Sequence, residues 1–179
     1  MKKISIILLF FLLYLNAYPE AKKPIEILAD SMEWNKQLGQ AIATGNAKAI
    51  QGETTIEANK IIAVLSEDNS QQIKELQASG KVVFLKDKQL ATGDKATYYL
   101  NQDKVIITGR VELKRDGNII KGEKLIIDFL TGLSKMEGYG TNQKVKMFGK
   151  WGIIVANSFS FDTGDHMIKF YNKPKLILN

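Results

Sequence analysis

The sequence predicts an all-β fold, in which short antiparallel strands follow one another along one axis in about five units of 29 residues. Three observations support this prediction: an internal repeat, alternation of apolar and polar residues within each unit, and turn-forming residues between the alternating stretches. After the N-terminal segment, no stretch shows the 3.6-residue apolar spacing of an amphipathic helix.

The repeat has two recurring features, an anchor and a marker. In the anchor, a small residue precedes Asp, Asn or Glu and then Lys or Ser; the anchors are Ala29-Asp30-Ser31, Ala58-Asn59-Lys60, Gly93-Asp94-Lys95, Gly122-Glu123-Lys124 and Ala156-Asn157-Ser158. The markers are Gly45, Gly80, Gly109, Gly138 and Asn172. Sixteen residues separate anchor from marker in four units, and thirteen separate three markers from the next anchor. Insertions of six residues near 66–72 and five within 139–152 explain the exceptions.

Apolar residues alternate on both sides of each marker, as expected for half-buried strands. The positions predicted to face a dry interior are Met32, Trp34, Ala41, Ala43, Ala47, Ala49, Ile61, Ala63, Leu76, Ala78, Val82, Phe84, Ala96, Tyr98, Val105, Ile107, Val111, Leu113, Leu125, Ile127, Ser134, Met136, Phe159, Phe161, Ile168, Phe170, Pro174 and Leu176. Turn formers separate these stretches, including Gln51-Gly52, Asn101-Gln102-Asp103, Asp116-Gly117 and Thr131-Gly132.

The N-terminus has the pattern of a secretory signal. Lys2 and Lys3 precede an apolar run over residues 4–15, which is short for a membrane-spanning helix. We therefore predict a signal peptide over residues 1–17, a linker over 18–23 and one β domain over 24–179, with export to the periplasm. An uncleaved membrane anchor is the alternative.

Composition argues against catalysis and metal binding. The chain has no Cys and a single His, His166, which removes thiolate sites and makes a His-based triad or metal site improbable. We predict no catalytic residues, no metal and no cofactor. The formal charge of +6 falls to +4 once Lys2 and Lys3 are removed, and the basic residues form no block. Nucleic acid is therefore not an expected partner.

Several segments resemble the OstA-type domain of the LptA family of periplasmic lipopolysaccharide transport proteins. They are P-I-E-I-L-A-D at 24–30, T-G-N-A at 44–47, I-E-A-N-K-I at 56–61, G-D-K-A-T-Y-Y-L at 93–100, I-I-T-G-R-V-E-L at 106–113 and I-I-K-G-E-K-L at 119–125. The resemblance covers roughly residues 24–138 in order. It is weaker beyond Gly138, where residues 139–152 interrupt the period and a fifth unit replaces a polar tail.

The resemblance implies an elongated, twisted β-jellyroll, or open barrel, of stacked antiparallel hairpins. It implies that lipid A acyl chains of lipopolysaccharide bind in an interior groove. It also implies head-to-tail assembly of the chain with itself and with LptC-like and LptD-like partners, without catalysis or a cofactor.

The residues of the candidate groove come from two sources, the positions that the family resemblance implies and the dry face that the alternation predicts. The family's groove-lining positions match Ile25, Phe84, Tyr98 and Leu100, and the dry face adds Met32, Trp34, Ala43, Ala47, Val111, Leu113 and Ile127. The alanines of the first unit would leave space for an acyl chain, unless Met32, Trp34 and Phe84 fill that space themselves. Ordinary core packing is the alternative role for each of these residues.

Both ends of the array are predicted to be edge strands, which are templates for strand addition. The candidate assembly residues are Ile25, Ile27, Ala29, Leu176 and Leu178. Pro174 and its flanking lysines are the kind of residues that protect an edge, so the N-terminal edge is the more available one.

Three other functions fit parts of the pattern. An LptC-like inner-membrane partner would share the fold and keep its N-terminal anchor. A polysaccharide-active enzyme on a β-solenoid would need clustered carboxylates, and the nearest approach is the pair Asp162 and Asp165 in one turn. A structural or adhesive repeat protein would bind no lipopolysaccharide.

Overall fold

The computed structural model describes residues 23–67, 72–86, 89–138, 144–162 and 167–178. The predicted signal peptide, most of the predicted linker, and His166 lie outside these residues. The described residues form fourteen strands: β1 (Glu26–Leu28), β2 (Ser31–Asn35), β3 (Gln40–Gln51), β4 (Thr54–Leu65), β5 (Ile73–Lys86), β6 (Gln89–Tyr99), β7 (Lys104–Arg115), β8 (Asn118–Asp128), β9 (Leu133–Glu137), β10 (Val145–Gly149), β11 (Gly152–Ala156), β12 (Ser158–Asp162), β13 (Ile168–Tyr171) and β14 (Lys175–Leu178).

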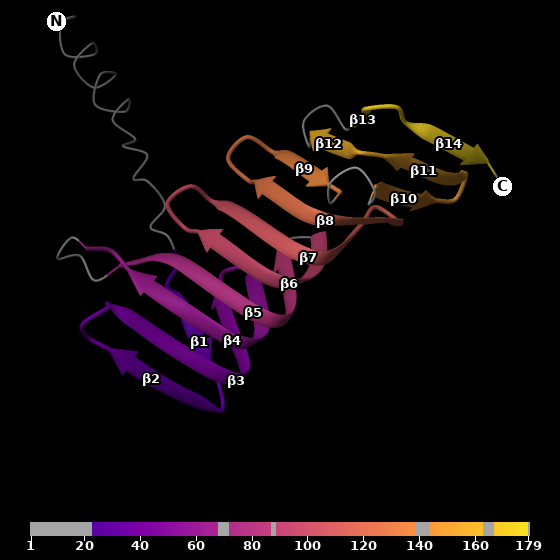
Figure 1. The fold of residues 1–179 in the computed structure, drawn as a ribbon. Coiled ribbons are helices and arrows are strands. Elements are labelled where there is room, and N and C mark those ends of the chain that lie inside the picture. Colours follow the sequence, from indigo (N-terminus) through magenta and orange to yellow (C-terminus); the bar gives the residue numbers. More distant parts are fainter. Residues whose placement is uncertain (1–22, 68–71, 87–88, 139–143, 163–166, 179) are drawn as a thin grey trace, which may run out of the picture.

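All fourteen strands belong to one antiparallel sheet that bends back on itself (Figure 1). The long strands β3 to β8 bend near their midpoints, so each contributes one half to each of two facing layers. The first layer begins with β2 and ends with β9, β12 and β13. The second layer begins with β1 and ends with β10, β11 and β14. The all-β, open, stacked-hairpin fold expected from the sequence is confirmed.

The bends explain why the marker glycines recur. Gly45, Gly80 and Gly109 have φ of 78°, 79° and 79°, and the residue after each is also left-handed. Strand pairing shifts register at each of these points, as it does at a β-bulge. Only glycine takes this conformation without steric cost, which fixes the marker in the sequence. In the last unit Asn172 and Lys173 take the same conformation, with φ of 61° each.

The short strands are halves of further bent strands. β1 and β2 each pair with one half of β3, and β9 and β10 each pair with one half of β8. In the same way β11 and β12 continue one another around a corner, as do β13 and β14. Counted this way, the described residues form ten bent strands, so each of the five repeat units corresponds to two. Residues 139–152, which interrupt the period, extend from beyond the end of β9 to the first residue of β11 and include strand β10.

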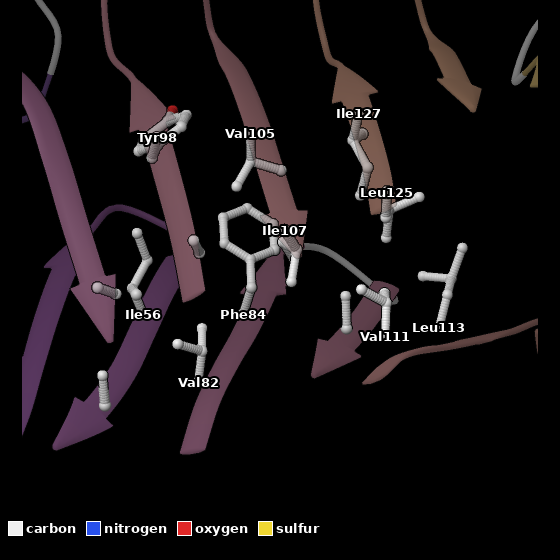
Figure 2. Close-up of a cluster of buried hydrophobic side chains, with 14 of the residues drawn as sticks. Ile56, Val82, Phe84, Tyr98, Val105, Ile107, Val111, Leu113, Leu125 and Ile127 are labelled. Carbon is white, nitrogen blue, oxygen red and sulfur yellow. The ribbon is translucent and has the colours of Figure 1, made fainter. Parts of the chain in front are cut away.

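The predicted inner faces meet between the two layers. Figure 2 shows Tyr98, Val105 and Ile127 pointing from one layer toward Ile56, Val82 and Phe84 of the other. Each layer's outer face carries the intervening polar residues, as alternation requires. The turns predicted at Gln51-Gly52, Asn101-Gln102-Asp103, Asp116-Gly117 and Thr131-Gly132 are found at residues 52–53, 100–103, 116–117 and 129–132.

The terminal positions of the predicted dry face are exposed, not buried. Met32 and Trp34 are 54% and 52% exposed, and Pro174 and Leu176 are exposed as well. The cross-strand partners of Met32 and Trp34 are Ala43 and Ala41, so both side chains lie on the inner face. They are exposed because β2, like β1, β13 and β14, ends a layer and has a paired neighbour on one side only.

Candidate functional site

The candidate site is the apolar interior between the layers. It brings together eight of the residues predicted to line a groove, all of them buried: Ala43, Ala47, Phe84, Tyr98, Leu100, Val111, Leu113 and Ile127. Ile25 is partly buried and packs against this cluster, whereas Met32 and Trp34 extend the inner face into solvent. The predicted set is therefore continuous along the sheet, but its N-terminal members are uncovered.

Side-chain size changes along the interior. Ala43, Ala47 and Ala49 occupy the N-terminal part and are almost inaccessible to solvent. Phe84 fills the middle, where it stacks on Phe129 with ring centroids 5.9 Å apart and meets Tyr98 edge-on at 6.1 Å. Met32 and Trp34, the cross-strand partners of Ala43 and Ala41, are 54% and 52% exposed.

The two layers are continuous at the bends that contain Gly45, Gly80 and Gly109, which we call the glycine corners. At the opposite ends of the half-strands, the free ends of the layers, a polar cluster closes the interior. The Tyr98 hydroxyl donates to Asp103 Oδ1 at 2.6 Å, and Lys86 Nζ donates to the same carboxylate at 2.8 and 3.0 Å. Lys86 Nζ also lies 3.9 Å from the centre of the Phe129 ring. Lys86 ends a second-layer half-strand and Asp103 precedes a first-layer one, so the ion pair joins the two layers.

Burial and the neighbouring Asp103 carboxylate raise the pKa of Tyr98 well above its usual range. Both effects disfavour the phenolate, because a second negative charge would lie in a poorly solvated site. Tyr98 therefore remains a hydrogen-bond donor over the whole physiological pH range.

A second cation occupies the equivalent position one unit later. Arg115 follows Gly109 by six residues, as Lys86 follows Gly80. Its guanidinium carbon lies 3.6 Å from the centre of the Phe161 ring, which belongs to the opposite layer. Such cation–π contacts strengthen when they are shielded from water.

The polar side chains at the free ends of the layers, which we call the polar rim, were not predicted from the sequence. Lys86, Arg115 and Ser134 all occupy inward positions of the alternation, and Ser134 was predicted to be inward without being given a role. The signal was present: Lys86 continues the series Val82, Phe84, and Arg115 continues Val111, Leu113.

The predicted edge residues fall into two environments. Ile27 and Ala29 are partly buried against the interior cluster, whereas Leu176 and Leu178 are exposed. β1 and β2 pair only with β3, β13 pairs only with β12, and β14 pairs only with β11, within the part of the chain that the structure describes. The strands predicted to end the array therefore do end it.

Neither a metal site nor a membrane-spanning helix is found in the described ranges. No group of three or more His, Asp or Glu side chains there is arranged to hold a metal ion. No helix in the same ranges is long and apolar enough to span a membrane.

The family model of the LptA/(LptD N-terminal domain) lipopolysaccharide transport protein matches residues 26–133. This match covers more than half of the chain, and the chain belongs to that family. The matched residues contain β1 to β8, which hold most of the apolar interior.

Individual relatives agree with this assignment. The lipopolysaccharide export system protein LptH of Pseudomonas aeruginosa is 27% identical over 116 residues, which are 61% of this chain and 65% of LptH. An uncharacterised protein of Rhizobium meliloti is 26% identical over 132 residues, covering 70% of this chain and 71% of the relative.

A solved structure shares the fold. The crystal structure of LptH, described as the LptA homologous periplasmic component of the lipopolysaccharide transport device of Pseudomonas aeruginosa, superposes with a TM-score of 0.63 at 20% identity. The superposition covers 70% of this chain and 94% of that one.

Proposed function

We propose that this chain is a periplasmic lipopolysaccharide carrier that holds lipid A acyl chains between its two layers and assembles head to tail. The observation that carries the proposal is the continuous apolar interior, which reaches exposed apolar side chains at the ends of the sheet. Each methylene transferred from water into such an interior contributes about 0.8 kcal/mol. Membership of a lipopolysaccharide transport family supports the choice of lipid.

The layered architecture supports entry of the lipid from the side. The layers are continuous at the glycine corners, whereas at their free ends side chains such as Lys86 and Asp103 join them. Separation at the free ends would expose the interior without breaking the sheet. In this proposal the protein performs no chemical step and needs no cofactor.

The ends of the sheet support assembly. Exposed apolar side chains gather on the terminal strands and their turns: Leu28, Met32, Trp34 and Leu38 at one end, and Met167, Tyr171, Leu176, Ile177 and Leu178 at the other. Strand addition at these edges would cover them. Self-association, and association with LptC-like and LptD-like partners through the same edges, follows from this proposal.

Photo-crosslinking tests the lipid assignment. We expect a photoactivatable amino acid at Phe84 or Tyr98 to capture lipopolysaccharide, because both side chains are buried between the layers. The matched control is Thr97, which points to the opposite face of the same strand. Equal capture at Thr97 and Tyr98 would argue against an interior site.

The N-terminus decides between a free carrier and an anchored partner. We propose that residues 1–17 are removed on export, which leaves residues 24–179 as one domain behind a short linker. Mass spectrometry of the protein from its native host should find a chain that begins at Tyr18. An intact Met1 in the membrane fraction would favour an LptC-like anchored protein instead.

A further inference from the structure

Arg115 is a cation inside an otherwise apolar region. Its side chain is only 14% exposed and points between the layers at the end of β7. The guanidinium rests on Phe161 of the opposite layer, and its Nε donates to Asp116 Oδ2 at 3.1 Å. Nη1 of the guanidinium is buried.

Two donors near this point have no partner among the described residues. They are Nη1 of Arg115 and the hydroxyl of Ser134, both buried. Ser134 is 1% exposed and lies in β9 of the first layer, whereas Arg115 belongs to the second. Both residues line one small cavity of about 20 Å³, whose other walls include the apolar Leu113, Met147 and Phe159 and the polar Asp116 and Asn118. A buried donor without an acceptor is costly, roughly 1–3 kcal/mol for a neutral group and more for a charged one.

The repeat shows why this cation differs from Lys86. Seventeen residues after Lys86 stands Asp103, which neutralises it across the layers. Seventeen residues after Arg115 stands Gly132, which has no carboxylate. The acidic side chain that Arg115 does contact, Asp116, is its own chain neighbour and is mostly exposed. Among the described residues, Arg115 forms no ion pair with a carboxylate of the opposite layer.

We propose that Arg115 and Ser134 bind the anionic group, phosphate or carboxylate, of a lipid whose acyl chain lies in the interior. This inference rests on the proposed lipid-binding function and adds a polar specificity site to it. A guanidinium and a hydroxyl donate together to anionic oxygens, and Arg is suited to planar, paired hydrogen bonds with such groups. The surrounding apolar walls would hold the first methylenes of the chain.

Binding requires the layers to separate locally. A cavity of about 20 Å³ has room for about one water molecule and not for a headgroup. Because Arg115 and Phe161 belong to opposite layers, breaking their contact would widen the cavity and free the guanidinium at the same time. The anion then replaces the aromatic ring as the partner of Arg115.

Calorimetric titration of the exported chain with three probes tests this site: decyl phosphate, decyl maltoside and inorganic phosphate, with both amphiphiles below their micelle concentrations. We expect Arg115→Gln to weaken decyl phosphate binding about tenfold, the effect of losing a hydrogen bond to a charged group. Decyl maltoside binding should change less than about twofold. Ser134→Ala should weaken decyl phosphate binding selectively by a smaller factor. Arg115→Lys keeps the charge but not the paired hydrogen-bond geometry, so its affinity should lie between those of the parent and Arg115→Gln.

Arg110→Gln is the matched control, because Arg110 lies on the same strand but is exposed and paired with Asp94. Equal loss of both amphiphiles in Arg115→Gln, or no loss of either, would overturn the anionic site while leaving the lipid-binding function intact. Binding of inorganic phosphate as tight as that of decyl phosphate would also overturn it, since the ligand would be a free anion. Failure of the unmodified chain to bind either amphiphile would instead contradict the proposed function itself. Thermal unfolding of each variant checks that it is folded.

Discussion

At the residue scale, two separate factors restrict the residue type at the glycine corners: the left-handed backbone and the space available for a Cβ. Gly109 has φ of 79°, and a Cβ added there would lie 2.5 Å from Asp94 Oδ2 and 2.8 Å from Asp94 Cβ. Gly117, in the turn between β7 and β8, has φ of 75° but no atom within 4 Å of an added Cβ. The first position is both strained and crowded for any other residue, and the second is only strained.

Gly109→Ala should therefore destabilise the protein more than Gly117→Ala. The left-handed backbone costs either alanine about 1–2 kcal/mol. The collision with Asp94 adds roughly 1–3 kcal/mol at Gly109 alone, because the anchor side chain must move. Urea unfolding monitored by circular dichroism measures the difference. Equal losses in the two variants would show that the anchor does not restrict the corner.

Tyr98 gives the stability a dependence on pH at the alkaline end. Its pKa is raised in the folded protein by burial and by Asp103, so above pH about 10 the unfolded chain loses the proton first. The native state then binds more protons than the unfolded state, and stability falls as pH rises. The stability that the tyrosine contributes over phenylalanine is fully present below that pH.

Tyr98→Phe should consequently lose stability at neutral pH, by about 1 kcal/mol for the hydrogen bond to Asp103. The difference in the free energy of unfolding between the variant and the parent should narrow above pH 10, since phenylalanine has no proton to lose. Unfolding free energies at neutral and alkaline pH, compared between the two proteins, measure this. A gap that stays constant would contradict the raised pKa.

At the element scale, alternation predicted which face a side chain is on but not whether that face is covered. For β7 it correctly placed Val111 and Leu113 inside. It also placed Met32 and Trp34 of β2 on the inner face, yet both are exposed. Face orientation is local, because it depends only on the two-residue period of a strand. Whether the inner face is buried depends on what lies next to the strand and across from it. The strands that end a sheet lack a neighbour on one side.

The polar rim was harder to predict for a related reason. A lysine or arginine at the end of a strand is normally solvated, so the inward positions of Lys86 and Arg115 in the alternation were the only sign of their burial. Their roles depend on aromatic rings of the opposite layer, Phe129 and Phe161, which are distant in the sequence. The markers Gly45, Gly80 and Gly109, in contrast, were predictable, because a left-handed corner restricts the residue type locally.

Strand position should also set the order of local opening. The central strands β5, β6 and β7 have paired neighbours on both sides and carry fully buried side chains such as Phe84 and Ile107. We expect their amide hydrogens to exchange most slowly, and those of β1, β2, β13 and β14 to exchange fastest. Hydrogen exchange with mass spectrometry measures this order. Slow exchange in β2 or β14 of the monomer would contradict it.

At the scale of the whole molecule, the two ends of the sheet are alike in their exposed edges and different in their side chains. The N-terminal end presents Met32 and Trp34 from its inner face, and the C-terminal end presents Leu176 and Leu178. Two copies joined end to end would cover both sets and continue both layers. The interior of one copy would then run into that of the next, so assembly and lipid passage would use the same apolar face.

Trp34→Glu should weaken this self-association about tenfold or more, because it places a charge where a large apolar side chain would be buried. Leu130→Glu is the matched control: Leu130 is 73% exposed, more than Trp34, but lies in the turn between β8 and β9 away from the terminal strands. Sedimentation velocity over rising protein concentration should show growth for the parent chain and for Leu130→Glu, and a monomer for Trp34→Glu. In the parent chain, hydrogen exchange in β1, β2 and β14 should slow over the same concentration range, because the edges become paired. Equal association of both variants would place the contact elsewhere and remove the link between the open ends and assembly.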